Sequence, residues 1–283
     1  MAVDKNTVEG SLTIPETING YSVVKIGKYA LYNIYNMTSV TIPNTVTSID
    51  DYAFYQCYGL TSFELPASVT SLGNCALSGL NNTTSIKVAE GNPKYDSRDN
   101  CNAIIEKATN KLLFGCMTTS IPATVTEIGK YAFRSLDNFT LTIPFTVTKI
   151  DDYAFVYCSN LTLEAEHTTP LVINENAFYD LSNSTLRVPA GSKAAYVSAT
   201  GWKNFGEENI VEMGSEPTVK PGDVNNDGTV SVADAVAIIS YVLGENPSNF
   251  NAAAADVNGD DKVTIADAVE VIKICGDKTN PSN

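Results

Sequence analysis

The sequence has little of what most catalytic sites use. Its 283 residues include a single histidine, His167, which lies in EAEHTTP with no Ser or Cys nucleophile motif nearby and no second histidine for a metal. We expect His167 to be a surface residue and predict no catalytic residues. A pair of carboxylates that cleaves glycosides cannot be recognised in a sequence with many acidic residues, so a polysaccharide-degrading activity stays an alternative.

Positive charge and long apolar runs are also scarce. The chain has 18 Lys and Arg against 32 Asp and Glu, which gives a formal net charge of −14. This excess of negative charge argues against nucleic acid or an anionic membrane as a partner. No run of about eighteen apolar residues is present, so we predict no membrane span.

The six cysteines do not form a compact disulfide or zinc framework. Cys57, Cys158 and Cys275 lie singly on apolar faces and are expected in the core. The segments around Cys101 and Cys116, NCNAIIE and KLLFGC, instead indicate two strands of a hairpin. The expected cross-strand pairs are Glu106–Lys111, Ile105–Leu112, Ala103–Phe114 and Cys101–Cys116. Whether the last pair forms a disulfide is left open by the sequence.

A sequence repeat occupies most of the segment 1–213. TSVTIPNTVTSIDDYAFYQCYGL (38–60) and TSFELPASVTSLGNCALSGLNNT (61–83) align without a gap, and 118–139 and 140–161 repeat the pattern in a slightly shorter form. A period of about 20 to 29 residues with apolar positions in register predicts a leucine-rich-repeat solenoid. Because each coil can bury its apolar edge only against its neighbours, no single repeat should fold alone.

Within one repeat, VTIP and VTSI point apolar residues inward, and a short helical turn carrying Ala-Phe is expected to close the coil. Three buried ladders follow: Ile42, Leu65, Ile121 and Ile143; Val46, Val69, Val125 and Val147; Ile49, Leu72, Ile128 and Ile150. The repeated tyrosines fit a structural ladder better than a sugar platform: Tyr29, Tyr52, Tyr131 and Tyr153. Trp202 is expected to plug the core. The outer strand positions are small and mostly uncharged, and indicate no pocket: Thr41, Glu64, Ser120 and Thr142.

These repeats resemble the BspA-like leucine-rich repeats of bacterial surface proteins. The segment GNPKYDSRDNCNAIIEKATNKLLFGC resembles the internal hairpin of that family, within about 84–117, and LRVPAGSKAAYVSATGWKNF resembles its C-terminal cap, 185–213. The resemblance implies a non-catalytic module, residues 1–213, that contacts a protein or surface ligand of unknown identity.

A second repeat consists of two acidic loops. DVNNDGTVSVAD and DVNGDDKVTIAD have the spacing of EF-hand calcium loops, in which oxygens at positions 1, 3, 5, 7, 9 and 12 surround the ion. The first set of predicted ligands is Asp223, Asn225, Asp227, Thr229 through its carbonyl, Ser231 through a water, and Asp234. The second set is Asp256, Asn258, Asp260, Lys262 through its carbonyl, Thr264 and Asp267.

Each loop departs from the EF-hand pattern. Position 12 is Asp instead of Glu, no clear helix precedes either loop, and each loop runs into an apolar helical segment, Val232 to Leu243 or Ile265 to Cys275. Position 6 of the second loop is Asp261 instead of Gly. A side chain in the left-handed conformation costs about 1 kcal/mol, so the second site should bind more weakly.

The stretch from Gly222 to Gly276 resembles the dockerin family of cellulosomes. The resemblance implies a type I-like module that folds around two calcium ions and docks onto a cohesin module of a scaffoldin. Recognition in the family centres on loop positions 10 and 11 and on the helix face after them. The implied cohesin-binding residues are Val232, Ala233, Ala237, Ser240, Ile265, Ala266, Glu270 and Lys273. The near-identity of the two copies leaves one or two docking orientations open, and their differences favour one.

Together these patterns predict an α+β chain of two domains: a mostly β solenoid with short helical turns at 1–213, and a small all-α duplicated loop-helix domain at 222–276. A linker at 214–221 and a tail at 277–283 complete it. Calcium sites of this kind would stay largely empty in a cytosol, so we expect a secreted, extracellular, cellulosome-attached protein whose leader has been removed. The alternative is a carbohydrate-binding or polysaccharide-degrading component. A calcium sensor would need a Met-rich groove, and no methionine follows Met213.

Overall fold

A computed structural model describes residues 8–214, 220–225, 227–247 and 250–277. The chain divides into two compact units, residues 1–214 and 215–283, and each is described by itself. The middle of the expected linker, 215–219, and almost all of the expected tail, 278–283, lie outside the described residues.

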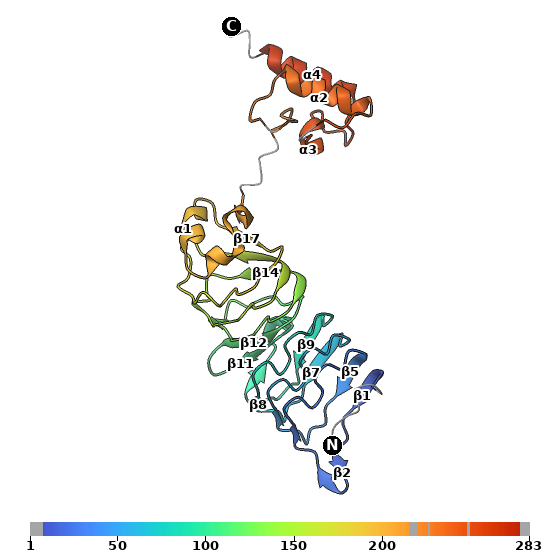
Figure 1. The fold of residues 1–283 in the computed structure, drawn as a ribbon, viewed down its shortest axis with the longest axis vertical. Helices are drawn as coiled ribbons and strands as arrows, with labels where there is room; N and C mark the ends of the chain where they lie inside the picture. The colour runs from blue at the N-terminus through green and yellow to red at the C-terminus, as the bar shows by residue number, and fades with distance from the viewer. Residues whose placement is uncertain (1–7, 215–219, 226, 248–249, 278–283) are drawn as a thin grey trace. The chain divides into compact units, whose positions relative to one another are not determined.

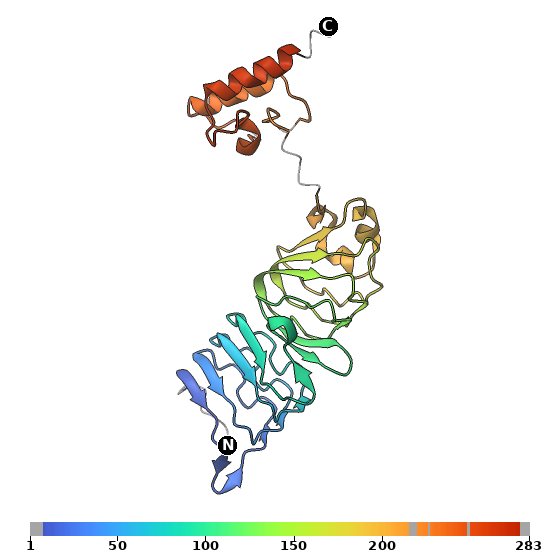
Figure 2. The same cartoon turned by 180° about the vertical axis from the view of Figure 1, so that it is seen from behind.

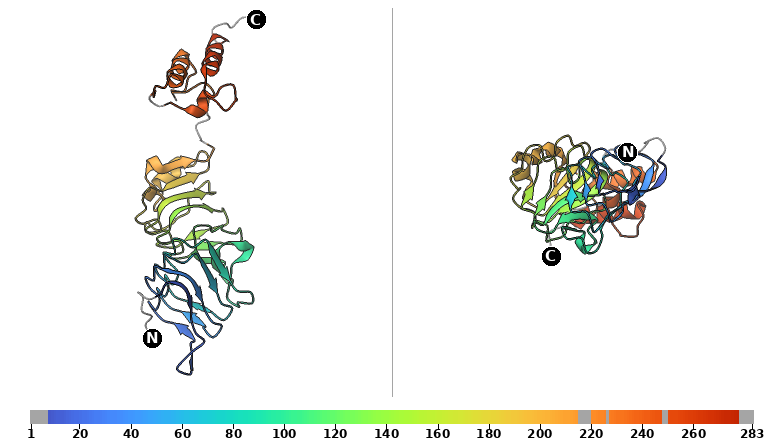
Figure 3. Two further views of the ribbon diagram at one scale, coloured as in Figure 1. Left: turned by 90° about the vertical axis from the view of Figure 1, so that its right-hand side faces the viewer. Right: turned by 90° about the horizontal axis from the view of Figure 1, so that it is seen from below.

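The first unit is a β-solenoid whose coils stack along its length (Figures 2 and 3). Most coils place one strand on a first face, where neighbouring strands are parallel (Figure 1). In the N-terminal half these strands are β1 (Gly10–Thr13), β5 (Met37–Thr41), β7 (Ser62–Leu65) and β9 (Ser85–Val88). In the C-terminal half they are β14 (Asp137–Ile143), β16 (Ser159–Ala165), β17 (Thr185–Val188) and β18 (Ile210–Glu212), which form one four-stranded sheet.

Two-residue strands that follow each Pro-containing turn form the second face. They are β4 (Lys25–Ile26), β6 (Ser48–Ile49), β8 (Ser71–Leu72), β13 (Glu127–Ile128) and β15 (Lys149–Ile150). A small hairpin of β2 (Thr17–Ile18) and β3 (Tyr21–Ser22) lies near the N-terminal end. The cap contains helix α1 (Lys193–Ser198) and the 3-10 helices η2 (Trp202–Phe205) and η3 (Glu207–Asn209), and a further 3-10 helix, η1 (Arg98–Asn100), precedes the central hairpin.

The segment that carries Ala-Phe in each repeat is a run of turns, where the sequence suggested a short helix. Alternate amides bond within the coil and to the next coil: Tyr55 N–H donates to Tyr52 O, whereas Phe54 N–H donates to Ala76 O. This alternation requires left-handed backbone at the repeated tyrosine, and Tyr52 has φ of 58°. Because half of these hydrogen bonds need a neighbouring coil, the backbone itself makes the repeats interdependent.

The predicted ladders form the core of this unit. Val46, Val69, Val125 and Val147 are all fully buried, and the other two ladders are buried except at Ile121 and Leu72, which are half-buried. The tyrosine ladder is confirmed, with ring centroids 5.1 Å apart for Tyr29–Tyr52 and 5.8 Å apart for Tyr131–Tyr153. Trp202 is fully buried, and its indole N–H donates to Leu171 O at 2.9 Å, so it plugs the core as predicted.

The single histidine is not the surface residue that the sequence suggested. His167 is half-buried, and its Nε2 lies 2.7 Å from Val147 O. The Tyr196 hydroxyl of α1 donates to His167 O at 2.8 Å. His167 therefore fastens the cap to the last repeats and has a structural role.

The central hairpin joins the second-face sheet and is registered differently from the prediction at its open end. Strands β11 (Ala103–Glu106) and β12 (Lys111–Gly115) pair Glu106 with Lys111 and Ile105 with Leu112, as expected. A bulge between Ile104 and Ile105 then shifts the register, so Ile104 opposes Phe114 and Ala103 opposes Gly115. The predicted pair Ala103–Phe114 is wrong because a bulge adds one residue to one strand only.

The same hairpin separates two hydrophobic cores. Cys101, Ile105 and Leu112 pack into the C-terminal core, whereas Ile104, Phe114 and Cys116 pack into the N-terminal core. Strands buried on both faces explain the unbroken apolar run AII. Cys101 and Cys116 thus point into different cores, and both are free thiols. Cys57 and Cys158 are buried, as predicted, and Cys275 is half-buried.

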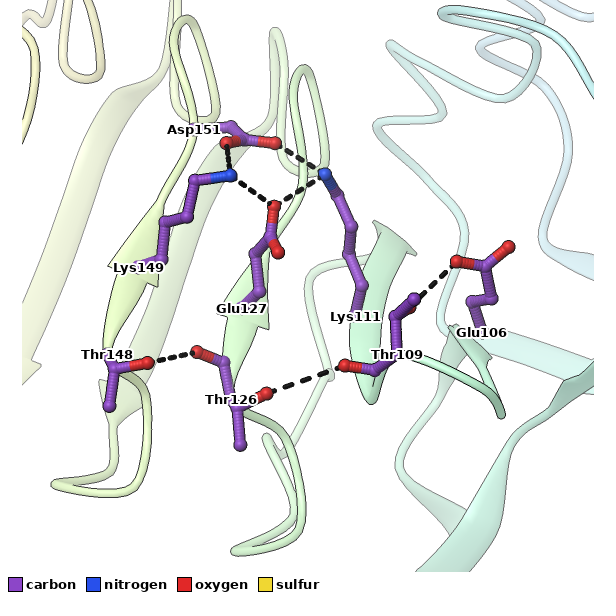
Figure 4. Close-up of polar contacts among 8 residues, drawn as sticks. All are labelled: Glu106, Thr109, Lys111, Thr126, Glu127, Thr148, Lys149 and Asp151. Atoms are coloured by element: carbon purple, nitrogen blue, oxygen red, sulfur yellow. Dashed lines mark hydrogen bonds and ion pairs between the residues drawn. The ribbon is translucent and has the colours of Figure 1, made fainter.

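A cluster of four charged side chains ties β12 to the next two coils (Figure 4). Lys111 Nζ lies 2.6 Å from Glu127 Oε1 and 2.5 Å from Asp151 Oδ2, and Lys149 Nζ lies 2.8 Å and 2.7 Å from the same two carboxylates. Although burial opposes ionisation of Asp151, hydrogen bonds from both lysines lower its pKa to about 2. Each charge here therefore has two partners of opposite sign.

The second unit is helical. Helices α2 (Val232–Val242) and α4 (Ile265–Asp277) lie side by side (Figures 1 and 3), over a core that includes Val224, Ile238 and Val271. A single helical turn, α3 (Ala252–Ala255), precedes the second acidic loop, where the sequence indicated no helix. Asn251 caps α3 by accepting from the amides of Ala253 and Ala254.

Candidate functional site

The first acidic loop is closed by its own carboxylates. Asp234 is completely buried at the start of α2; its Oδ1 accepts from Val224 N (2.9 Å) and Asn225 N (3.2 Å), and its Oδ2 accepts from Ser231 N (2.9 Å). At the other end, Asp223 accepts from the amides of Asp227 and Gly228. These bonds fold positions 1 to 12 into one compact loop.

The second loop has the same pattern at the equivalent atoms. Asp267 is also completely buried, and accepts from Val257 N (3.0 Å), Asn258 N (3.2 Å) and Thr264 N (2.8 Å). Asp256 accepts from the amides of Asp260 and Asp261. The internal duplication seen in the sequence is therefore also a duplication of local geometry.

Position 6 has left-handed backbone in both loops. Gly228 has φ of 87°, and Asp261 has φ of 62°. Glycine takes this conformation without cost, whereas a side chain is strained in it. Position 6 is therefore strained in the second loop only, and weaker calcium binding by that loop stays a prediction.

Two of the loop carboxylates have lowered pKa values. Hydrogen bonds from the Thr229 hydroxyl and amide and from Asn225 lower the pKa of Asp227. Burial raises the pKa of Asp267, but hydrogen bonds from Thr264, Asn258 and Val257 outweigh it and leave the pKa below its usual range. Both groups stay ionised at neutral pH and carry concentrated negative charge.

The donor atoms of the loops suit a hard cation. The predicted ligands of each loop offer carboxylate, amide, hydroxyl and carbonyl oxygens and no sulfur or imidazole, which is the chemistry that calcium prefers. In the described part of the chain, no three carboxylate, imidazole or thiol groups converge as a ready-made metal site. The carboxylates instead accept from the loop amides, so the residues fit calcium by the type of their donor atoms and by their order in the sequence.

Two of these residues have a second, metal-independent role. Ser231 is the N-cap of α2: its hydroxyl accepts from Ala233 N, while Asp234 accepts from the Ser231 amide. This is a capping box, which satisfies amide groups at the helix start and contributes about 1 kcal/mol to the helix. Residue types at positions 9 and 12 thus serve the helix as well as the loop.

An exposed apolar stripe runs along both helices. Val232 and Val236 on α2 are exposed, as are Ile265, Val269 and Ile272 on α4, with values such as 56% for Val236 and 46% for Val269. The positions of Val232 and Val236 correspond to those of Ile265 and Val269 in the other copy.

Sequence periodicity did not distinguish this stripe from the core. Ala235, Ile238, Ala268 and Val271 are the residues that face inward. The inward-facing side of α2 could have been deduced from loop position 12. Because Asp234 is buried, its neighbour Ala235 and the residue four positions after it, Ile238, lie on the same inner side of the helix.

The implied cohesin-binding residues lie on or beside this stripe. Val232, Ala233, Ile265 and Ala266 are all exposed in the first turns of the helices. The two copies differ further along, where Ala237 and Ser240 on α2 correspond to Glu270 and Lys273 on α4. Glu270 and Lys273 form an ion pair at 2.7 Å, so these positions are charged on α4 and uncharged on α2. The duplication is therefore imperfect at its surface.

Comparison with known families accounts for both units. The model of the BspA type leucine-rich-repeat region matches residues 24–102 and 104–192 in six copies. The chain belongs to the BspA-type leucine-rich-repeat family. A second model, the dockerin type I domain, matches residues 221–274, so this BspA-type protein carries a type I dockerin domain after its repeats.

Solved structures of bacterial leucine-rich-repeat proteins are similar to this chain. A leucine-rich cell surface protein from Faecalibacterium prausnitzii is 22% identical, covering 74% of this chain and 61% of that one, with a TM-score of 0.49. A leucine-rich-repeat protein from Eubacterium ventriosum is 21% identical, covering 71% and 66%, with a TM-score of 0.42. The chain therefore spans less than two thirds of the length of both. No curated protein matches it.

The combination of a leucine-rich-repeat module and a dockerin domain indicates a dockerin-bearing component of the cellulosome type. Both modules are of non-catalytic kinds. Within the described ranges, no helix combines the length and apolar character needed to cross a membrane.

Proposed function

We propose that this BspA-type protein is a non-catalytic, secreted component of a cellulosome. Its dockerin would bind a cohesin module of a scaffoldin in a calcium-dependent way and display the repeat unit as a recognition module. The observation that carries this proposal is the paired geometry of residues 222–276. Two loops with the same carboxylate-to-amide pattern each lead into a helix with an exposed apolar stripe.

The loops are the proposed sites of two calcium ions, one per loop. The ligands would be Asp223, Asn225, Asp227, Thr229, Ser231 and Asp234 in the first loop, and Asp256, Asn258, Asp260, Lys262, Thr264 and Asp267 in the second. A bound calcium ion supplies charge neutralisation to the crowded carboxylates. The chain's own part is to fix the starts of α2 and α4 through Asp234 and Asp267, which both belong to a loop and to a helix.

The partner face is proposed to be the apolar stripe of α2, α4 or both. Apolar side chains such as Val236 and Val269 would be buried on docking, and burial of apolar area is the main favourable term in association. The Glu270–Lys273 ion pair gives α4 a polar rim that α2 lacks. This difference supports one preferred orientation, since a cohesin that buries Ala237 and Ser240 would have to desolvate charges at the equivalent places on α4.

Substitutions at loop positions 10 and 11 test the face directly. Val232→Asp/Ala233→Asp, Ile265→Asp/Ala266→Asp and the combined variant would be titrated against a panel of cohesins in calcium by calorimetry. Asp is favourable in the first turn of a helix, so these changes should leave the helices folded. Val172→Asp, at a fully exposed apolar residue of the repeat unit, is the matched control.

Loss of affinity in one double variant only indicates a single orientation, and loss only in the combined variant indicates two. Where a loss occurs, it should be at least about tenfold in affinity, which is about 1.4 kcal/mol. Unchanged binding by all three variants would remove this face from the cohesin interface. Cohesin binding that persists in excess chelator would remove calcium from the account.

A further inference from the structure

The start of the second half of the solenoid departs from the repeat. By sequence, residues 118–121 should form a first-face strand equivalent to β5 and β7, yet they form none. The central hairpin holds this segment instead: Ser120 N–H donates to Cys101 O at 3.1 Å, and the Thr119 hydroxyl donates to Asn102 O at 2.8 Å. As a result, β14 is an edge strand of its sheet.

A hollow of about 310 Å³ is lined by this displaced segment and by β14. Its walls come from the displaced segment, from β14 and from the residue after β16. Its polar lining residues are Thr119, Ser120, Thr140, Thr142 and Glu166, and its apolar lining residues are Ile121 and Pro144. The sequence indicated no pocket at Ser120 and Thr142, and this expectation is wrong because the hairpin displaces one strand.

An exposed aromatic residue, Phe145, directly follows Pro144, which lines this hollow. Phe145 is 70% exposed, and its amide donates to Glu166 Oε2 at 3.1 Å. The equivalent residues of the other repeats are small: Asn44, Ala67 and Ala123. A lone exposed aromatic residue needs no explanation by itself. Here, however, three other repeats have a small residue at this place, and the aromatic residue occurs in the repeat whose Pro144 lines the hollow.

We propose that this hollow, together with Phe145, binds a short segment of a neutral polysaccharide. Sugar rings present C–H groups on their faces and hydroxyls around their edges, so they pack on an aromatic ring while bonding to hydroxyls and a carboxylate. Ligand sites are typically about 300–1,000 Å³, so this one suits one or two sugar units at a time. The remainder of the polysaccharide would extend along the solvent side.

Charge selects a neutral ligand over an acidic one. The residues that line the hollow include the Glu166 carboxylate and, within the described chain, no lysine or arginine. Arg187 lies on the neighbouring strand β17, and its Nε forms an ion pair with Glu164 Oε1 at 3.4 Å. A uronic-acid polymer would bring its carboxylates toward Glu166 in a chain of net charge −14, and like charges repel.

The test uses the full chain in calcium with cellotriose, xylotriose and mannotriose as neutral probes and a galacturonic acid trimer as the acidic probe. Binding is measured by saturation-transfer NMR and calorimetry. Phe145→Ala installs a residue type that two other repeats carry at this place, so it should fold normally. Tyr21→Ala, on the β2–β3 hairpin, removes another strongly exposed aromatic ring and is the matched control.

We expect at least one neutral trisaccharide to bind, Phe145→Ala to weaken that binding by at least about tenfold, and Tyr21→Ala to leave it unchanged. Glu166→Gln should weaken it less, because an amide oxygen can still accept from the sugar and from Phe145 N. No binding by any neutral probe, equal binding by Phe145→Ala, or preference for the acidic trimer would each overturn the proposal. Cohesin binding, measured separately, is expected to be the same in all these variants.

Discussion

The two units of this protein achieve stability in different ways. The larger of the two repeat cores contains twenty-nine buried apolar residues, among them a row of stacked rings formed by Phe133, Phe155 and Phe178. Among the described residues of the dockerin, the core contains eight, of which Ala235, Ala254, Ala255 and Ala268 are alanines. A small core of small side chains buries little apolar area and therefore contributes little stability. Closure of the two acidic loops must contribute the rest of the stability of this unit.

The comparison predicts opposite responses to chelation, and this is the largest expected effect. Removing calcium takes away the charge that would neutralise the acidic loops around buried Asp234 and Asp267, in a unit with little core, so α2 and α4 should lose their structure. Hydrogen exchange followed by mass spectrometry on the full chain, with and without chelator, should show lost protection in 222–276 and none in the repeats. Equal protection of both units in chelator would erase the distinction.

A core truncation in the solenoid should do the reverse. Phe155→Ala removes the ring between Phe133 and Phe178, each 5.0 Å away, and should cost about 3–5 kcal/mol of repeat-unit stability. Denaturant unfolding followed by Trp202 fluorescence reports this loss. Calcium affinity should not change, and a coupled fall in calcium affinity would show that the units do not fold independently.

Acid should weaken the repeat unit at the ion cluster of Asp151. The pKa of Asp151 is about 2 in the folded state and about 3.9 in unfolded chains, so its contribution is full above about pH 4 and falls as pH drops toward 2. The loss is about 1–2 kcal/mol after allowance for partial exposure. Asp151→Asn should be less stable than wild type at pH 7 by this amount and should converge with it near pH 2. A constant difference across this range would remove the ion cluster as the cause.

The smallest expected effect distinguishes the two loops. Asp261→Gly relieves the left-handed strain of loop position 6 and should strengthen the second calcium site by about 1 kcal/mol. Gly228→Asp should weaken the first site by a similar amount. Calcium titration of both variants checks the pair; no change in either would mean that position 6 does not set the difference between the sites.

Much of this organisation could be predicted from the sequence because both units are repeats. A valine at the same place in successive repeats can be buried only by stacking, and Asp at loop positions 1 and 12 recurs with its amide partners in the second loop. Some of the features that were not predicted lie where a repeat contacts the central hairpin, which is not a repeat. The bulge in β11–β12 changes which residues face each other, and no local pattern marks it.

The surfaces were predicted less well than the cores. Val236 and Val269 share the helical spacing of core residues, yet both are exposed in the structure. The hollow beside β14 depends on Ser120 bonding to Cys101, a contact between a repeat and an insertion that periodicity does not describe. Phe145 was visible in the sequence as a departure from Asn44, Ala67 and Ala123, and such departures were the available signal.

Calorimetric titration of calcium into the chelator-treated full chain tests the central claim most directly. The account predicts two binding steps of unequal affinity, the weaker in the loop that carries Asp261, with recovery of helical signal as they fill. A chain that takes up no calcium at millimolar concentration, or whose helices form fully before any is added, would contradict it.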